Sequence, residues 1–162
     1  MIVIVSGPPC TGKSTIAAAL ERETGWTWLE MDRIRQRLLP ESDQRQKDRD
    51  LAYRAMHLMA EYLVGLGHSV ILDATYGRPE MREAAAGLGA PILVVQCQAP
   101  GEVAVERFRA RAPGHGAVDL TKSRVLELNA SFEYSSEALV LDTSQPIEVC
   151  MAQVRKYLKE RA

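Results

Sequence analysis

The chain has 162 residues, of which 46% are hydrophobic and 25% are charged, and its formal net charge at pH 7 is −1. This length suits one domain with a substantial core, and the near-neutral charge excludes a general electrostatic attraction to nucleic acid or to a membrane surface. The three cysteines are far apart and have no metal-ligand spacing, which fits small buried thiols in a reducing compartment. The first residues already belong to a predicted core strand, and no apolar run approaches membrane-spanning length. We therefore expect a cytoplasmic protein with no membrane partner.

The first predicted elements are a buried strand at residues 2–6, a glycine-framed loop and a helix at 13–24. The loop has the spacing GxxxxGK[ST], in which backbone N–H groups and the positive end of the helix converge on phosphate oxygens. Lys13 is predicted to reach the β- and γ-phosphates of a nucleoside triphosphate, and the Ser14 hydroxyl to bind Mg²⁺. The residues predicted to contact the nucleotide here are Gly7, Pro8, Pro9, Cys10, Thr11, Gly12, Lys13, Ser14 and Thr15.

The second predicted strand, at residues 26–31, leads to Asp32 and a short helix that ends near Leu39. A carboxylate at this position would face the γ-phosphate and accept a proton from an attacking hydroxyl. Arg35 lies one helical turn later and would hold an anionic or polar part of the acceptor. In the alternative interpretation Asp32 only caps the helix, and Arg33, Arg35 and Arg37 lie on a solvated face.

The next predicted elements are a long amphipathic helix that follows the polar stretch 41–50 and a third, fully buried strand at 69–73. One face of the helix carries Leu51, Ala55, Leu58, Tyr62 and Leu66. Asp73 ends the strand, and an acidic residue in this position beside a phosphate loop usually binds Mg²⁺, often through water. A turn or helix-capping role for Asp73 is the alternative.

The remaining predicted elements are helices near 79–88, 101–111, 121–134 and 146–161, and strands at 91–96 and 138–141. Arg107 and Arg111 share one face of the predicted helix at 101–111, which precedes a glycine-rich loop. They suit a lid, at approximately 107–120, that closes over the triphosphate and neutralises charge. Arg111 is the preferred lid arginine, and surface ion pairs with Glu102 and Glu106 are the alternative for both.

Strands and helices alternate throughout the chain, which predicts an α/β fold with a five-stranded parallel sheet covered by helices on both faces. We expect one three-layer P-loop domain over residues 1–162. Ligands of such sheets bind beyond the carboxyl ends of the strands, where the phosphate loop, Asp32 and Asp73 are all predicted to lie.

These positions together resemble the small P-loop kinases that include the kinase domain of polynucleotide kinase, chloramphenicol phosphotransferase and the zeta-toxin-like kinases. The matching segments are Gly7–Thr15, the pair Asp32 and Arg35, residues 63–75 and residues 99–111. The resemblance implies a nucleoside-kinase-like fold with a lid, and Asp32 as general base. It also implies that Arg35 contacts an acceptor phosphate and that Arg111, or else Arg107, contacts the donor phosphates.

The favoured hypothesis is a kinase that uses ATP and Mg²⁺ to phosphorylate a hydroxyl group. The acceptor is either a small molecule or the 5′-hydroxyl of a polynucleotide. For the polynucleotide, arginines near Asp32 could form a local basic rim. A GTP-dependent switch is disfavoured because no Asn-Lys-x-Asp segment is present. A regulatory nucleotide-binding ATPase without a phosphoacceptor is the remaining alternative.

Overall fold

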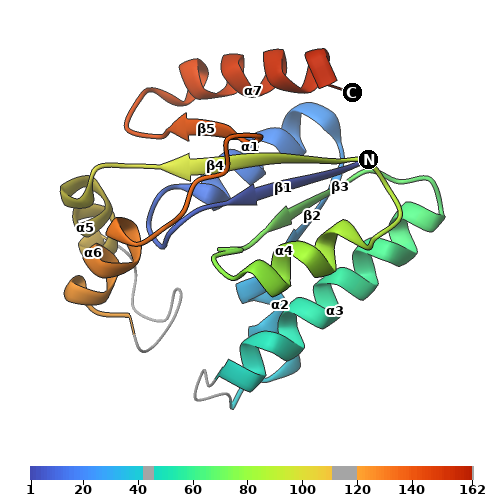
Figure 1. The fold of residues 1–162 in the computed structure, drawn as a ribbon, viewed down its shortest axis with the longest axis horizontal. Helices are drawn as coiled ribbons and strands as arrows, with labels where there is room; N and C mark the ends of the chain where they lie inside the picture. Colours follow the sequence, from blue (N-terminus) through green and yellow to red (C-terminus); the bar gives the residue numbers. More distant parts are fainter. Residues whose placement is uncertain (42–45, 111–119, 162) are drawn as a thin grey trace.

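A computed structural model describes residues 1–41, 46–110 and 120–161 (Figure 1). Within these residues five strands form one parallel sheet in the order β2-β3-β1-β4-β5. The strands are β1 (Ile2–Ser6), β2 (Thr27–Glu30), β3 (Val70–Asp73), β4 (Ile92–Gln98) and β5 (Leu139–Asp142). The predicted fold class, an α/β P-loop fold with a five-stranded parallel sheet, is confirmed.

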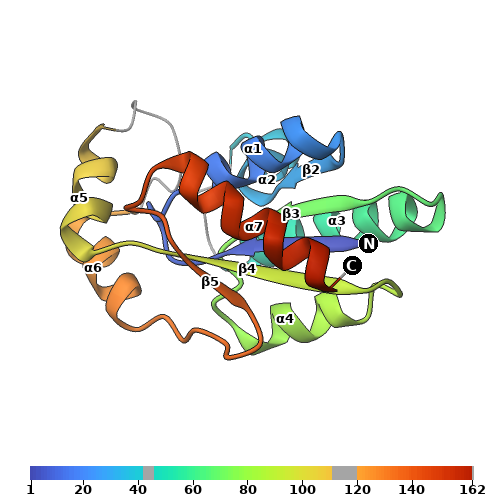
Figure 2. The same cartoon turned by 90° about the horizontal axis from the view of Figure 1, so that it is seen from above.

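Helices cover both faces of this sheet, as the two perpendicular views show (Figures 1 and 2). Helices α1 and α7 pack on one face, α3 and α4 on the other, and α5 and α6 lie side by side beyond the carboxyl end of β4. The helices are α1 (Lys13–Thr24), α2 (Met31–Leu38), α3 (Gln46–Gly65), α4 (Pro79–Ala86), α5 (Gly101–Ala110), α6 (Lys122–Ala130) and α7 (Ile147–Arg161).

The apolar run of β1 lacks alternating polar residues because both faces of the strand are covered by helices. Ile2 and Ile4 pack toward α3 and α4, whereas Val3 and Val5 pack toward α1 and α7, so both faces of the strand are buried. The parallel register sets Asp73 beside Val5 of β1 and beside Glu30 of β2. The loop after β1 and the helix after β2 therefore begin on either side of Asp73.

Helix α3 contacts the sheet with a face that the sequence pattern does not indicate. Its buried residues are Ala52, Tyr53, Met56, His57 and Ala60. Small residues on this face allow the helix to approach the sheet closely. The apolar face predicted from the sequence is turned outward, and Leu51, Leu58 and Tyr62 are exposed.

Candidate functional site

The loop between β1 and α1 has the backbone geometry of a phosphate cradle. Gly7, Cys10 and Gly12 have positive φ values of 134°, 65° and 85°, respectively. Gly12 precedes α1 without any side-chain hydrogen bond that caps the helix, so the first amide groups of α1 are left for another acceptor. Such a helix N-terminus, with its positive dipole end, favours an anion.

Gly7 is required by a close backbone approach. A Cβ atom at this position would lie 2.4 Å from the carbonyl oxygen of Cys97 on β4, and the φ of 134° is unfavourable for other residues. We predict that Gly7→Ala lowers the free energy of unfolding by at least about 3 kcal/mol, because a steric clash adds to the backbone strain. Chemical denaturation monitored by circular dichroism measures this loss.

Gly67 offers a matched control for this prediction. Its φ is 86°, but nothing lies within 4 Å of the position of a Cβ atom. Gly67→Ala should therefore cost only the backbone strain, about 1–2 kcal/mol. Equal losses for the two variants would show that the approach of Cys97 does not constrain the loop.

Lys13 and Thr11 both bind the carbonyl oxygen of Pro8 in this loop. The Lys13 ammonium donates to it at 2.9 Å and the Thr11 hydroxyl at 2.8 Å. The lysine side chain is thus folded over the cradle. A phosphate in the loop would offer Lys13 a charged acceptor in place of a neutral one, and such hydrogen bonds are stronger.

Asp73 lies buried between the phosphate loop and Asp32. Burial raises the pKa of the Asp73 carboxyl, the nearby Lys13 ammonium and Ser14 hydroxyl act in the opposite direction, and Asp32 raises the pKa further. Its Oδ2 atom is buried and has no hydrogen-bond partner among the described residues. Ser14 and Asp73, both predicted to bind metal, are therefore adjacent, with one carboxylate oxygen left for a ligand.

These two residues fit Mg²⁺ that is bound mainly by nucleotide and water. In the described part of the chain no group of three or more His, Cys, Asp or Glu side chains could hold a metal by itself. Magnesium usually retains several waters and uses one or two protein ligands together with substrate phosphates. A hydroxyl and a buried carboxylate beside a phosphate cradle match that requirement.

Asp32 and Arg35 form an ion pair within the first turns of α2. The Arg35 guanidinium donates to Asp32 Oδ1 at 3.3 Å, and the side chains are 3% and 47% exposed, respectively. Asp32 is thus open to solvent and held by a buried cation. The solvated-face alternative is wrong for Arg35, although Arg33 and Arg37 are exposed. Arg35 orients Asp32, and its contact with an acceptor stays a prediction.

Arg107 is held against the phosphate loop by Thr143, which follows β5. The guanidinium donates to Thr143 Oγ1 at 3.1 Å and to the Thr143 carbonyl at 2.6 Å, and the hydroxyl of Thr143 lies 2.6 Å from the Thr11 carbonyl. Arg107 therefore does not make the alternative ion pairs with Glu102 or Glu106. Arg111 and residues 111–119 of the predicted lid lie outside the described residues.

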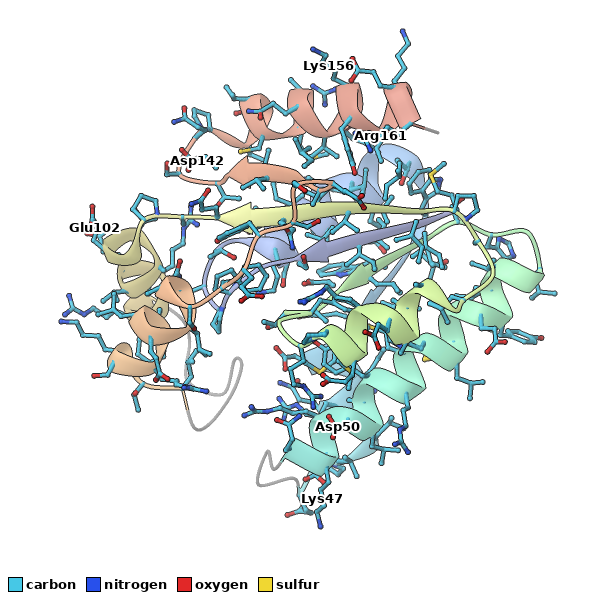
Figure 3. The ribbon with its side chains drawn as sticks, viewed as in Figure 1. Lys47, Asp50, Glu102, Asp142, Lys156 and Arg161 are labelled. Atoms are coloured by element: carbon cyan, nitrogen blue, oxygen red, sulfur yellow. The ribbon has the colours of Figure 1, made fainter. Side chains whose placement is uncertain are left out.

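A pocket of about 480 Å³ opens beside this arginine. It lies on the other side of the phosphate loop from Asp32, at the start of α1 and α7. Residues that line it include Cys10, Gly12, Thr15, Arg107, Thr143 and Gln145. The turn after β5, marked by Asp142 in Figure 3, thus contributes to the wall of a pocket adjoining the cradle.

A buried aromatic cluster, which no pattern in the sequence indicates, supports the segment after β3. Tyr76 has a left-handed φ of 49°, its amide donates to the Tyr53 hydroxyl at 3.0 Å, and its own hydroxyl lies 2.8 Å from His57 Nε2. Burial raises the pKa of Tyr53 to about 12. The cluster fixes the backbone next to Thr75, whose carbonyl accepts from the Gly7 amide at 3.3 Å.

The parallel sheet and its phosphate loop define a P-loop fold of the kinase type, and comparisons with known proteins agree. The chain matches the protein family described as AAA domain over residues 2–134. It belongs to that family.

Curated relatives share sequence but have no described activity. An uncharacterized protein of Mycobacterium tuberculosis is 31% identical over 168 residues, which cover 94% of this chain and 33% of the relative. An uncharacterized protein of Mycobacterium bovis matches with the same values. The chain thus spans about a third of the length of these relatives.

Similar solved structures include small kinases. A sugar kinase from Janibacter has a TM-score of 0.77 and 23% identity, with 98% of this chain and 94% of that chain covered. The APS kinase CysC of Mycobacterium tuberculosis, in complex with AMPPNP and APS, has a TM-score of 0.74 and 24% identity, covering 98% and 96%. A gluconokinase from Sinorhizobium meliloti has a TM-score of 0.73 and 17% identity, covering 98% and 91%. At these identities the likeness establishes the fold.

None of the helices in the described ranges combines the length and the apolar composition that a membrane span requires.

Proposed function

We propose that the protein is an ATP-dependent kinase that transfers the γ-phosphate of ATP to a hydroxyl group of an acceptor. The observation that carries this proposal is the convergence of Lys13, Ser14 and Asp32 around buried Asp73, at the carboxyl ends of three neighbouring strands. A phosphate cradle on one side and a solvent-accessible carboxylate on the other are the two halves that phosphoryl transfer to an alcohol requires.

The donor half would bind the triphosphate along the cradle. Backbone amides of residues 7–14 and the start of α1 would hold the phosphate oxygens, and Lys13 would exchange the Pro8 carbonyl for the β- and γ-phosphates. Ser14 and Asp73 would hold Mg²⁺, which when bound neutralises phosphate charge. The nucleoside would occupy the pocket beside Arg107, which would also neutralise charge on the donor phosphates.

The acceptor half would be organised by Asp32. Its carboxylate would take the proton of the acceptor hydroxyl while the oxygen bonds to the γ-phosphorus and the bond to the β–γ bridging oxygen breaks, so that ADP leaves. Arg35 keeps the carboxylate in place through an ion pair with its buried guanidinium. Thr75 follows Asp73 and would form the neighbouring wall, which the buried side chain of Tyr76 supports from behind.

The test is a screen with γ-labelled ATP and Mg²⁺ against a panel of hydroxyl compounds. The panel contains nucleosides, 5′-hydroxyl DNA and RNA, sugars, gluconate, adenosine phosphosulfate, shikimate, aminoglycosides and other antibiotics. Transfer of label to one class that depends on Asp32 supports the proposal. Tight ATP binding with no transfer to any member, and hydrolysis unaffected by the panel, would instead favour a nucleotide-binding regulatory ATPase without a phosphoacceptor.

A further inference from the structure

Helix α3 presents an apolar stripe to solvent on the side opposite its buried face. The large side chains in the stripe are 44–69% exposed, and Leu66 continues it because its amide still donates to the Tyr62 carbonyl at 3.2 Å. On a helical wheel the stripe falls within an arc of about 100°. We call these residues the α3 stripe: Leu51, Ala55, Leu58, Met59, Tyr62 and Leu66.

Packing inside the chain does not account for this stripe. Helix α3 packs against α2, α4, β2 and β3 through its other side, and the stripe stays exposed with all described residues (1–41, 46–110 and 120–161) in place. Contiguous apolar patches of this kind mark interaction sites in soluble proteins. The phosphate loop and Asp32 contribute no residue to it.

We propose that the α3 stripe binds the α3 stripe of a second copy of this chain in an antiparallel, twofold-symmetric dimer. The stripe is complementary to itself when it is reversed about its midpoint between Leu58 and Met59. Residues at equal distances from that midpoint then oppose each other across the interface. The resulting pairs are Leu51 with Leu66, Ala55 with Tyr62, and Leu58 with Met59, so the smallest side chain of the stripe meets the largest.

Charges beside the stripe favour the same arrangement. Arg54 and Glu61 are exposed on one flank of the stripe, about two turns apart. A twofold axis perpendicular to two antiparallel helices brings the same flank of both copies together, so Arg54 of each copy faces Glu61 of the other. In a parallel pair these flanks would point apart. The midpoint between Arg54 and Glu61 lies within one residue, about 1.5 Å, of the midpoint of the stripe.

The size of the stripe predicts a reversible dimer. One helix face is smaller than the roughly 800 Å² per partner of a standard stable interface. We therefore expect a concentration-dependent equilibrium, in which sedimentation velocity of the full chain shows the mass rising from 17.9 kDa toward twice that value in the micromolar range. A chain that stays monomeric to the highest soluble concentration would overturn the proposal.

Charge exchange tests which face is used. Arg54→Glu and Glu61→Arg should each weaken the dimer about tenfold or more, since each places like charges together twice per dimer. The double variant Arg54→Glu/Glu61→Arg should restore the wild-type dissociation constant. Lys156→Glu, on α7 at the opposite side of the molecule (Figure 3), is the matched control and should change nothing. A dimer that is insensitive to both single exchanges would be formed by another face, which also overturns the proposal.

Cysteine cross-linking tests the direction of the helices. Two copies of residue 58 lie next to the twofold axis, so Leu58→Cys should form an intermolecular disulfide under mild oxidation. Two copies of residue 51 are separated by about 22 Å along the helices, so Leu51→Cys should not. The native cysteines are buried, and the wild-type chain gives the background. In a parallel pair each stripe residue would lie near its own copy, so cross-linking of Leu51→Cys as well as of Leu58→Cys would indicate that arrangement and contradict the inference.

Discussion

Replacing Asp32 by asparagine is expected to lower kcat for phosphoryl transfer by about 10²–10⁴-fold, the usual contribution of a general base. The amide keeps the size of the side chain and can still accept from Arg35, but it cannot take a proton. Binding of ATP should be retained, because Asp32 lies across from the phosphate loop and outside the pocket beside Arg107. Single-turnover transfer to the acceptor found in the screen measures the first effect, and calorimetric titration with a non-hydrolysable ATP analogue measures the second.

Gln36→Ala provides the control for this variant. Gln36 is exposed on the same short helix, and among the described residues it makes no hydrogen bond to the site. Its kcat should match that of the wild type. Full transfer by Asp32→Asn would remove Asp32 from the role of base, whereas loss of ATP binding would place it in the donor half.

Replacing Asp73 by asparagine is expected to act in opposite directions on activity and stability. The variant should need 10–100-fold more Mg²⁺ for half-maximal activity, the usual cost of losing a carboxylate that supports a metal. Without metal and nucleotide, however, it should unfold at a higher temperature than the wild type. The reason is that burial raises the pKa of Asp73, which means that its charged form opposes folding.

The pH dependence of this stability difference has a defined sign. Between the unfolded pKa of Asp73, near 3.8, and its higher folded pKa, the folded chain binds more protons than the unfolded chain. The stability of the wild type relative to Asp73→Asn therefore falls as pH rises through this interval, and the full penalty is present above it. Thermal unfolding of both proteins across a pH series, with chelator present, measures the effect.

Asp142→Asn is the contrasting control. Hydrogen bonds from Ser144 lower the pKa of Asp142, so its charged form supports folding and its removal should not stabilise the chain. It should also leave the Mg²⁺ requirement unchanged. A stabilising effect of equal size in both variants would show that removing negative charge in general, and not the burial of Asp73, is responsible.

The sequence was sufficient to predict the sheet and the segment around the phosphate loop. Apolar runs such as those of β1 and β3 are continuous because both faces of each strand are buried. Gly25, in a left-handed conformation with φ 70°, ends α1 at the predicted residue. Parallel pairing then places the strand ends at one edge, which is why Asp32 and Asp73 could be selected without coordinates.

Contacts between distant segments could not be predicted in the same way. Nothing near Arg107 in the sequence indicates Thr143 as its partner, and nothing near Tyr76 indicates Tyr53 and His57. The outward direction of the α3 stripe was missed for a different reason. Its residues are more apolar than the small and aromatic residues that face the sheet, so periodicity alone pointed to the wrong side.

The hydrogen bond from the Gly7 amide to the Thr75 carbonyl has an entropic consequence. It ties the loop after β1 to the segment after β3, and Tyr53 anchors that segment to α3 from behind through the Tyr76 amide. The spacing between these two segments is therefore fixed when the chain folds. A looser arrangement would lose conformational freedom each time a donor and an acceptor bind. Here that freedom is lost once, during folding, so less binding energy is needed to bring donor and acceptor together.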